Sequence, residues 1–233
     1  MTEAHQDVTV TDPTNNNITP QHILVFGATG GTGKAFVEQA LAHGHTITAF
    51  VRDPSKLTAH ENLKTVQGDL FDADAVKAAS TSAHTAVFTA YGFSNKEPDN
   101  KHQRVTQAVV DGMKAAGIKR IVAVSSMGAT DTKGIGPFWV RMVAKVILKH
   151  IIPDKTLQEA VLMNAGESWD LSWTILRPPM LLSKPGTGTY TAWTGMKPPS
   201  KVKWKIARAD VASEGLRCIE TGDHAGEGVQ LSW

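Results

Sequence analysis

The sequence predicts an α/β fold built on a doubly wound parallel sheet. Short apolar runs alternate with helical segments from residue 21 almost to the end of the chain, and a glycine-rich turn joins the first run to the first helix. The length of 233 residues is enough for one such domain with a sizeable core. We therefore expect residues 21–233 to form a single domain whose strands pair in parallel through right-handed crossovers.

The elements follow from the local pattern. Apolar runs predict strands at 22–27, 45–51, 64–68, 84–90, 120–126 and 171–176. Helices are predicted at 32–42, 72–80, 102–116 and 155–168, and in the third of these the apolar residues recur at the spacing of one helix face. The pair Asp53-Pro54 reads as an N-cap followed by proline at the first helical position.

Some segments do not fit the alternation. The first 20 residues are rich in Thr, Asn and Asp, so we expect a disordered tail. The stretches 127–137 and 177–200 are rich in glycine, or in glycine and proline, and they follow predicted strands. Ligands bind at the carboxyl ends of strands in open α/β sheets, which makes both stretches candidates for the site. The remaining C-terminus should form a small cap on the same core.

Composition excludes several classes of protein. Lys and Arg exceed Asp and Glu by only two, too few for a typical nucleic-acid binder. No apolar run reaches the roughly 18 to 20 residues that span a bilayer, so we expect no membrane association. The single cysteine, Cys218, rules out an internal disulfide framework and fits a buried thiol in a reducing compartment, so we expect a cytoplasmic protein.

The stretch ILVFGATGGTG, residues 23–33, carries the strongest functional signal. Its glycines form GxxGxxG between a strand and a helix: Gly27 for the tight turn, Gly30 for close approach of a ligand, Gly33 for strand–helix packing. The helix N-terminus then offers free N–H groups to a pyrophosphate, and Thr29 and Thr32 add hydroxyls. The spacing differs from that of a P-loop. The motif predicts a Rossmann-type dinucleotide-binding domain.

The end of the second strand indicates which dinucleotide is bound. An acidic residue there favours NAD, whereas arginine favours the 2′-phosphate of NADP. This chain has Arg52, while the neighbouring Asp53 is expected to cap a helix, and Lys56 adds positive charge one turn later. The sequence therefore predicts NADPH as cofactor.

The stretches VFGATGGTG, FVRDPSKL, GDL, AVSS and LRPP resemble the atypical short-chain dehydrogenase/reductases. The similarity is greatest to the biliverdin reductase B/flavin reductase group and the NmrA-like proteins. It implies that Asp69 and Leu70 lie by the adenine, that Thr89 to Tyr91 line the cofactor, and that Ser126 and the Pro178-Pro179 turn lie by the nicotinamide. With the glycine turn, the predicted cofactor-binding set is Gly27, Thr29, Gly30, Gly31, Thr32, Gly33, Arg52, Lys56, Asp69, Leu70, Thr89, Ala90, Tyr91, Ser125, Pro178 and Pro179.

The chemistry expected at this site is limited. Neither Tyr91 nor Tyr190 has the lysine four residues later that most short-chain dehydrogenases use. Hydride transfer from NADPH to an acceptor that needs little acid help, such as a flavin, quinone or tetrapyrrole, is therefore the favoured reaction. Ser126 is the catalytic candidate. The residues expected against the substrate are Tyr91, Met127, Trp139 and Met180; the last stands where the resembled group has histidine.

Alternatives remain open at this stage. The chain could be a non-catalytic NADP(H) sensor of the NmrA kind that binds a protein partner, or a tailoring oxidoreductase of secondary metabolism. Arg141, Lys145 and Lys149 recur every four residues and form either a solvated helix face or a dock for an anionic substrate. The histidines show no metal-ligand spacing, so no metal is expected. A monomer or small homo-oligomer is expected.

Overall fold

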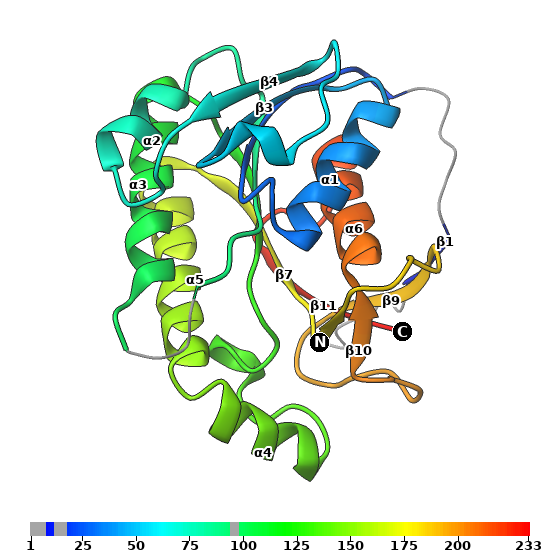
Figure 1. Cartoon of the computed structure of the whole chain (residues 1–233). Helices are drawn as coiled ribbons and strands as arrows, with labels where there is room; N and C mark the ends of the chain where they lie inside the picture. The colour runs from blue at the N-terminus through cyan, green and yellow to red at the C-terminus, as the bar shows by residue number, and fades with distance from the viewer. Residues whose placement is uncertain (1–7, 12–17, 94–97) are drawn as a thin grey trace.

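The computed structural model describes residues 8–11, 18–93 and 98–233, and the predicted doubly wound α/β architecture is confirmed. One nine-stranded sheet runs through the molecule with helices on both faces (Figure 1). Across the sheet the order is β1-β9-β11-β7-β6-β5-β2-β3-β4. Along the chain these strands are β1 (Val8–Thr11), β2 (His22–Phe26), β3 (Thr46–Val51), β4 (Leu63–Gln67), β5 (Ala86–Thr89), β6 (Arg120–Val124), β7 (Ser172–Arg177), β9 (Thr189–Thr194) and β11 (Glu227–Ser232).

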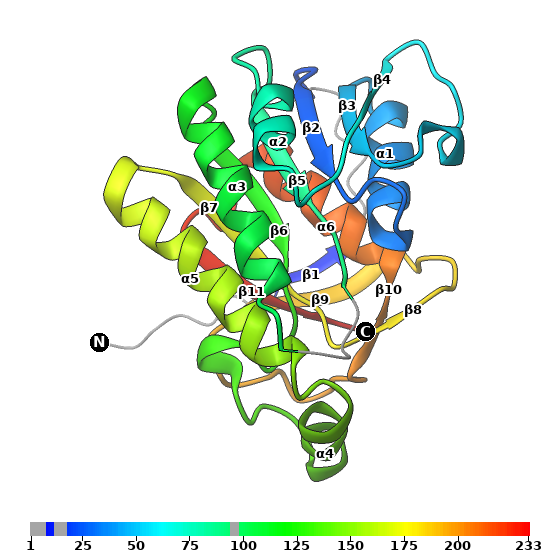
Figure 2. The same cartoon turned by 60° about the vertical axis from the view of Figure 1, so that its left-hand side comes forward.

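The helices form two layers. Along the chain they are α1 (Gly31–Ala42), α2 (Ala73–Ala79), α3 (Lys101–Ala116), α4 (Phe138–Ile147), α5 (Ile151–Trp169) and α6 (Arg208–Thr221). Helices α1 and α6 lie side by side on one face of the sheet, and α2, α3 and α5 cover the other (Figures 1 and 2). A separate two-stranded sheet pairs β8 (Met180–Leu182) with β10 (Lys205–Ala207) in parallel.

The sheet has its topological switch point beside β2. From β2 the chain moves outward to β3 and β4, then returns to place β5 on the other side of β2, followed outward by β6 and β7. All of these neighbours pair in parallel. In open α/β sheets the ligand crevice lies at the carboxyl edge of this point. The glycine turn, which follows β2 directly, therefore starts in the crevice.

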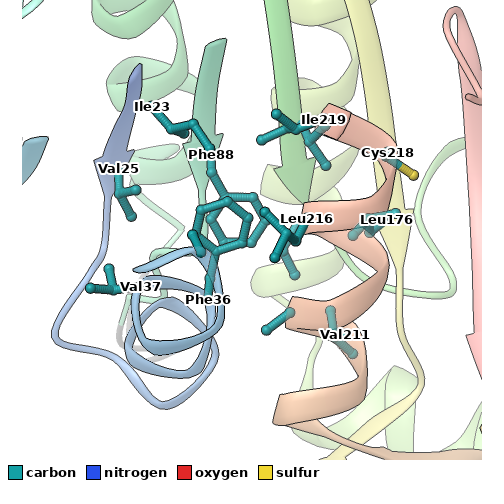
Figure 3. Packing of buried hydrophobic residues seen from close by; sticks show 14 of the residues in the cluster. Ile23, Val25, Phe36, Val37, Phe88, Leu176, Val211, Leu216, Cys218 and Ile219 are labelled. Carbon is teal, nitrogen blue, oxygen red and sulfur yellow. The ribbon is translucent and has the colours of Figure 1, made fainter. Parts of the chain in front are cut away.

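Aromatic packing joins α1 and α6 to the sheet. The ring of Phe36 on α1 stacks on that of Phe88 on β5, with centroids 3.8 Å apart and planes 4° from parallel (Figure 3). Leu216 and Cys218 of α6 belong to the same buried cluster. A side chain at Gly215 would collide with the Phe88 ring, so this glycine allows α6 to approach the sheet. Cys218 is buried as expected, and burial raises the pKa of its thiol.

The structure differs from the sequence expectation at both ends of the chain. Residues 8–11, predicted to be part of a disordered tail, form β1 and pair antiparallel with β9, which corrects that expectation for these four residues. The rest of the predicted tail up to residue 17 lies outside the described residues. The C-terminal segment is more than a small cap, because β11 pairs in parallel with β7 inside the main sheet and α6 covers a sheet face.

The proline-rich stretch 177–200 also contains regular structure, β8 and β9, that its composition concealed. Strand β9 pairs antiparallel with β11, so β9 and β1 form an antiparallel edge on an otherwise parallel sheet. In the described part of the chain, no helix has the length and apolar character needed to cross a bilayer.

Candidate functional site

The glycine turn has the geometry that a phosphate-binding loop requires. Gly27 has a φ of +88°, and a Cβ there would lie 2.7 Å from the backbone of Ala90, so only glycine fits. A Cβ on Gly33 would collide with the carbonyl of Gly27, which confirms close strand–helix packing. Helix α1 begins directly after Gly30 with no acidic residue in its first turn and no side-chain cap. Its first N–H groups therefore remain available to an anion.

Gly30 is not a strained position of the turn. Its φ is −76° and its ψ 161°, an extended conformation open to any residue. A Cβ there would have 3.4 Å to the Gly27 oxygen and 3.7 Å to the Ala90 oxygen, so the folded chain has room for it. A ligand can therefore approach the backbone closely at Gly30. Thr29 is exposed next to it, whereas Thr32 is buried.

Arg208, the first residue of α6, covers the turn and is absent from the sequence prediction. A Cβ on Gly31 would lie 2.6 Å from Cδ of Arg208, so the arginine side chain passes directly over Gly31. Its guanidinium Nη1 donates to Ser183 Oγ at 2.8 Å and to the Leu181 carbonyl at 3.4 Å. A guanidinium beside a helix N-terminus adds to the positive potential at the expected pyrophosphate position.

The end of β3 leaves two cations beside this turn. The Asp53 carboxylate accepts from the backbone N–H of Ser55 at 3.1 Å and from its hydroxyl at 2.6 Å, so the predicted cap is confirmed on a 3-10 turn, Pro54–Lys56. These bonds lower the pKa of Asp53. Lys56 Nζ lies 3.9 Å from Asp53, and Arg52 and Lys56 are both exposed. Asp53 is therefore committed to the turn, while Arg52 is accessible to a ligand.

The remaining predicted cofactor residues lie at the same edge of the sheet. Asp69 follows β4, is exposed, and accepts from the Phe71 N–H at 3.0 Å, with Leu70 half-buried between them. Thr89 ends β5 and is buried, and the half-buried Ala90 follows it against the glycine turn. The topology thus brings the glycine turn and the ends of β3, β4 and β5 to one edge, as the prediction requires.

Tyr91 is not placed as a stacking platform. Its ring is buried, and its hydroxyl shares a 2.5 Å hydrogen bond with Thr106 Oγ1 of α3. Burial raises the pKa of this hydroxyl. Tyr91 is expected against the substrate, but in this structure its buried ring offers almost no free face for an acceptor. Its backbone still borders Gly27 and can line the cofactor.

Two serines follow β6. Ser125 donates its backbone N–H to the Leu176 carbonyl at 2.8 Å, and among the described residues its buried hydroxyl has no hydrogen-bond partner. A buried hydroxyl without a partner is costly, which makes it a group that a bound ligand would satisfy. Ser126 is half-buried and donates to the Met127 carbonyl at 3.2 Å. Met127 in turn donates its backbone N–H to the carbonyl of Pro178 at 3.0 Å, which joins the ends of β6 and β7.

Beneath these serines lies a buried lysine that the sequence analysis missed. Lys155, in the first turns of α5, donates from Nζ to the carbonyl of Val124, the last residue of β6, at 3.0 Å. Nζ also lies 5.9 Å from the centroid of the Tyr91 ring. Burial lowers the pKa of Lys155 to about 7, despite the opposing charges of Asp154 and Glu159. The signal available in the sequence was a charged residue on the inward face of a predicted helix.

Two carboxylates of α5, Asp154 and Glu159, hold this helix against its neighbours through hydrogen bonds. Asp154 accepts from the backbone N–H groups of His102 and Gln103, at 2.9 and 3.0 Å, and so caps the start of α3. Glu159, fully buried, accepts from Arg177 Nη2 at 2.7 Å and from Nε at 3.2 Å. Arg177 also pairs with Asp131 at 2.7 Å, in the stretch after β6. The arginine of the LRPP motif therefore ties α5 and the stretch after β6 to the strand end that carries Pro178 and Pro179.

The predicted substrate residues do not form one surface. Met127 is buried in a small cluster with Ile135 and Trp193. Met180 is exposed on β8, immediately after Pro179, and remains at the predicted edge. Trp139 is exposed on α4. None of the four offers a preformed aromatic wall.

A cluster of possible metal ligands lies elsewhere. His43, His45 and Glu220 place ligand atoms within 4.8 Å of one another, so the histidines are less scattered than the sequence suggested. His45 Nδ1 accepts from the backbone N–H of Gln21 at 3.0 Å, and Nε2 lies 2.9 Å from Glu220. A metal on Nε2 would force the ring proton onto Nδ1, against that N–H donor. Hydrogen bonds therefore explain why these three side chains lie together. The two histidines come just before β3, so the cluster lies at the amino end of that strand.

Comparisons with known proteins agree with this geometry. The model of the NAD(P)H-binding family matches residues 27–221. The UPF0659 protein YMR090W of Saccharomyces cerevisiae is 28% identical over 208 residues, covering 84% of this chain and 86% of the yeast protein.

Two solved structures show the same architecture. ChuY, an anaerobillin reductase from Escherichia coli O157:H7, superposes with a TM-score of 0.74 at 26% identity, covering 91% of this chain and 96% of that one. A short-chain dehydrogenase/reductase from Veillonella parvula in complex with NADP has a TM-score of 0.71 at 17% identity, covering 92% and 95%, which bears on the fold alone. The chain belongs to the NAD(P)H-binding family and is an oxidoreductase of the Rossmann type, related to the atypical short-chain dehydrogenase/reductases.

Proposed function

We propose that this protein is an NADPH-dependent reductase that passes hydride to a conjugated acceptor such as a flavin, a quinone or a tetrapyrrole. The observation that carries the cofactor choice is the end of β3, where Asp53 is engaged by Ser55 while Arg52 is accessible. A carboxylate occupied as a helix cap is poorly available to a ribose hydroxyl, and an accessible guanidinium suits a 2′-phosphate.

The residues at the carboxyl edge fit a nicotinamide dinucleotide. The uncapped start of α1 and the guanidinium of Arg208 would hold the pyrophosphate, and the buried Ser125 hydroxyl needs a partner. When bound, the reduced nicotinamide supplies the hydride. The chain's contribution is then to bind, orient and keep water out, with Ser126 and the Pro178–Pro179 turn as the groups nearest the expected nicotinamide position.

A proton source is available close to the serines. Lys155 Nζ lies against the carbonyl of Val124, two residues before Ser126, and its lowered pKa means that it exchanges a proton near neutral pH. We propose that Lys155, through Ser126 or a water molecule, supplies the proton that a reduced flavin, quinone or tetrapyrrole takes up. This role suits a chain without a Tyr-x-x-x-Lys pair.

The similarity to ChuY supports a reductase and agrees with a tetrapyrrole among the candidate acceptors. The experiment is a screen of NADPH oxidation with flavins, quinones and biliverdin, run beside a titration of NADPH binding. A reductase oxidises NADPH with at least one acceptor. Tight NADPH binding with no turnover on any of them would favour a non-catalytic sensor instead.

A further inference from the structure

Helix α4 exposes large apolar side chains. The exposed fractions are 75% for Phe138, 55% for Trp139, 43% for Met142 and 62% for Val146. Phe138, Met142 and Val146 follow at four-residue spacing and so form one stripe along the helix, with Trp139 beside it. Ile147, at the end of the helix, is also exposed. One exposed apolar residue is ordinary, but five on a ten-residue helix mark an interaction surface.

A row of positive charge borders this stripe. Arg141 and Lys145 lie on the same helix and Lys149 follows it, all exposed and each one position before or three after a stripe residue. No Asp or Glu occurs between Asp131 and Asp154 in the sequence. An exposed apolar stripe with aromatic residues, bordered by basic charges alone, is a pattern of helices that lie in the membrane interface.

A second segment extends the basic surface. In residues 195–205, Lys201, Lys203 and Lys205 are exposed, while Val202 and Trp204 between them pack toward Met127 and Trp193. A Cβ on Gly136, just before α4, would lie 3.0 Å from the Trp204 ring, so the two segments are in contact. The sequence has no acidic residue between Asp170 and Asp210. We call residues 132–150 and 195–205 together the basic lobe.

Helix α4, the apolar part of the basic lobe, protrudes from the molecule. In Figures 1 and 2, α4 stands away from the sheet at the lower end of the molecule. Small molecules bind in concave sites that bury most of their surface, so a protruding stripe does not suit the anionic-substrate dock considered from the sequence. A self-associating interface is also disfavoured, because a two-fold contact would bring the acid-free basic surfaces of two copies together.

We propose that the basic lobe docks this protein on an anionic lipid bilayer, with the α4 stripe inserted among the acyl chains and the Lys and Arg side chains against the headgroups. The protein then lies on the membrane without spanning it, which revises the expectation of no membrane association. That expectation considered only spanning segments. The proposal depends on the surface of the lobe and not on the proposed reductase activity.

The test is co-sedimentation of the full chain with vesicles, without added cofactor. Wild type should partition to phosphatidylcholine/phosphatidylglycerol vesicles at least tenfold more strongly than to pure phosphatidylcholine, and high salt should weaken the binding. Each basic residue near an anionic surface raises the affinity for it by a factor of about five, so R141Q/K145Q should bind the anionic vesicles about 25-fold more weakly. F138S/M142S should lose roughly 10- to 100-fold even at low salt, because the apolar stripe no longer inserts.

A matched control removes the same charge elsewhere. K77Q/K114Q replaces two exposed lysines on α2 and α3, on a different part of the surface, and should bind vesicles almost as wild type apart from a small loss of net charge. Equal binding to both vesicle types, or lobe variants that bind as the wild type does, would overturn the proposal. So would a wild-type dimer that F138S/M142S converts to a monomer in the absence of vesicle binding. Circular dichroism and NADPH binding confirm that each variant is folded.

Discussion

The choice between NADPH and NADH depends most directly on Arg52, so the Arg52→Ala variant gives the sharpest prediction. The side chain is exposed at the end of β3, and no carboxylate of the described residues lies within ion-pair distance of it. Removing it should therefore leave the fold unchanged. Any effect on binding then reports a contact with the ligand.

The magnitude follows from the type of contact. Hydrogen bonds to charged groups contribute about 1.5 to 3 kcal/mol, which corresponds to a loss of about 10- to 100-fold in NADPH affinity. An exposed site is screened by solvent, so the lower half of that range is expected. NADH has no 2′-phosphate, so its affinity should change by less than about twofold. Lys56→Ala should show the same preference with a smaller effect, because Asp53 already lies 3.9 Å from its ammonium group.

The assay is a calorimetric titration of the wild type, Arg52→Ala and Lys56→Ala with each cofactor. Lys114→Ala, which removes an exposed charge far along α3, serves as the matched control and should bind both cofactors as the wild type does. An equal loss of affinity for NADPH and NADH in Arg52→Ala would refute the phosphate assignment. So would an unchanged NADPH affinity.

Four further predictions concern the turn, the chemistry and the stability. Gly30→Val should fold, since its Cβ has 3.4 Å to the nearest atom, but should lose both cofactors; normal binding by titration would show that the turn is only structural. Ser126→Ala should lower turnover roughly 10- to 1,000-fold with little change in NADPH affinity, and steady-state NADPH oxidation that matches the wild type would remove Ser126 from the mechanism. Wild-type turnover should fall as pH rises through about 7, as Lys155 loses its proton, and Lys155→Met should be slower and lack that step in its pH–rate profile. Between about pH 7 and the ordinary lysine pKa, Lys155 is neutral in the folded chain but protonated in the unfolded chain. The free energy of unfolding of the wild type should therefore rise with pH over this range, whereas that of Lys155→Met should not.

Features defined by neighbouring residues were predictable from the sequence. The turn at Gly27 and Gly33, the cap at Asp53 and the parallel strands around β2 are confirmed because periodicity and turn chemistry are local properties. The predicted helix at 155–168 starts earlier, at Ile151, because Pro153 falls in the first turn, where proline is tolerated.

Features that depend on distant contacts were not predictable in the same way. Arg208 reaches Gly31 only because α6 packs beside α1. Lys155 reaches Val124 only because α5 packs on β7, which pairs with β6 in the sheet. Strands β1 and β9 lie at a sheet edge, where short polar or proline-flanked segments pair because an open row of backbone groups is available. The local sequence around these side chains and strands gives no indication of their distant partners.

Transfer of deuterium from NADPH tests the central claim, reduction of a conjugated acceptor, most directly. The wild type is incubated with NADPH deuterated on the reactive nicotinamide carbon and with a tetrapyrrole acceptor, and the reduced product is analysed by mass spectrometry. A tetrapyrrole is used because it takes the hydride on carbon, whereas the products of flavins and quinones exchange this hydrogen with water. The account predicts one deuterium in the product, none when unlabelled NADPH is used, and a large loss of rate in Ser126→Ala. Tight NADPH binding with no product from flavins, quinones or tetrapyrroles would contradict it.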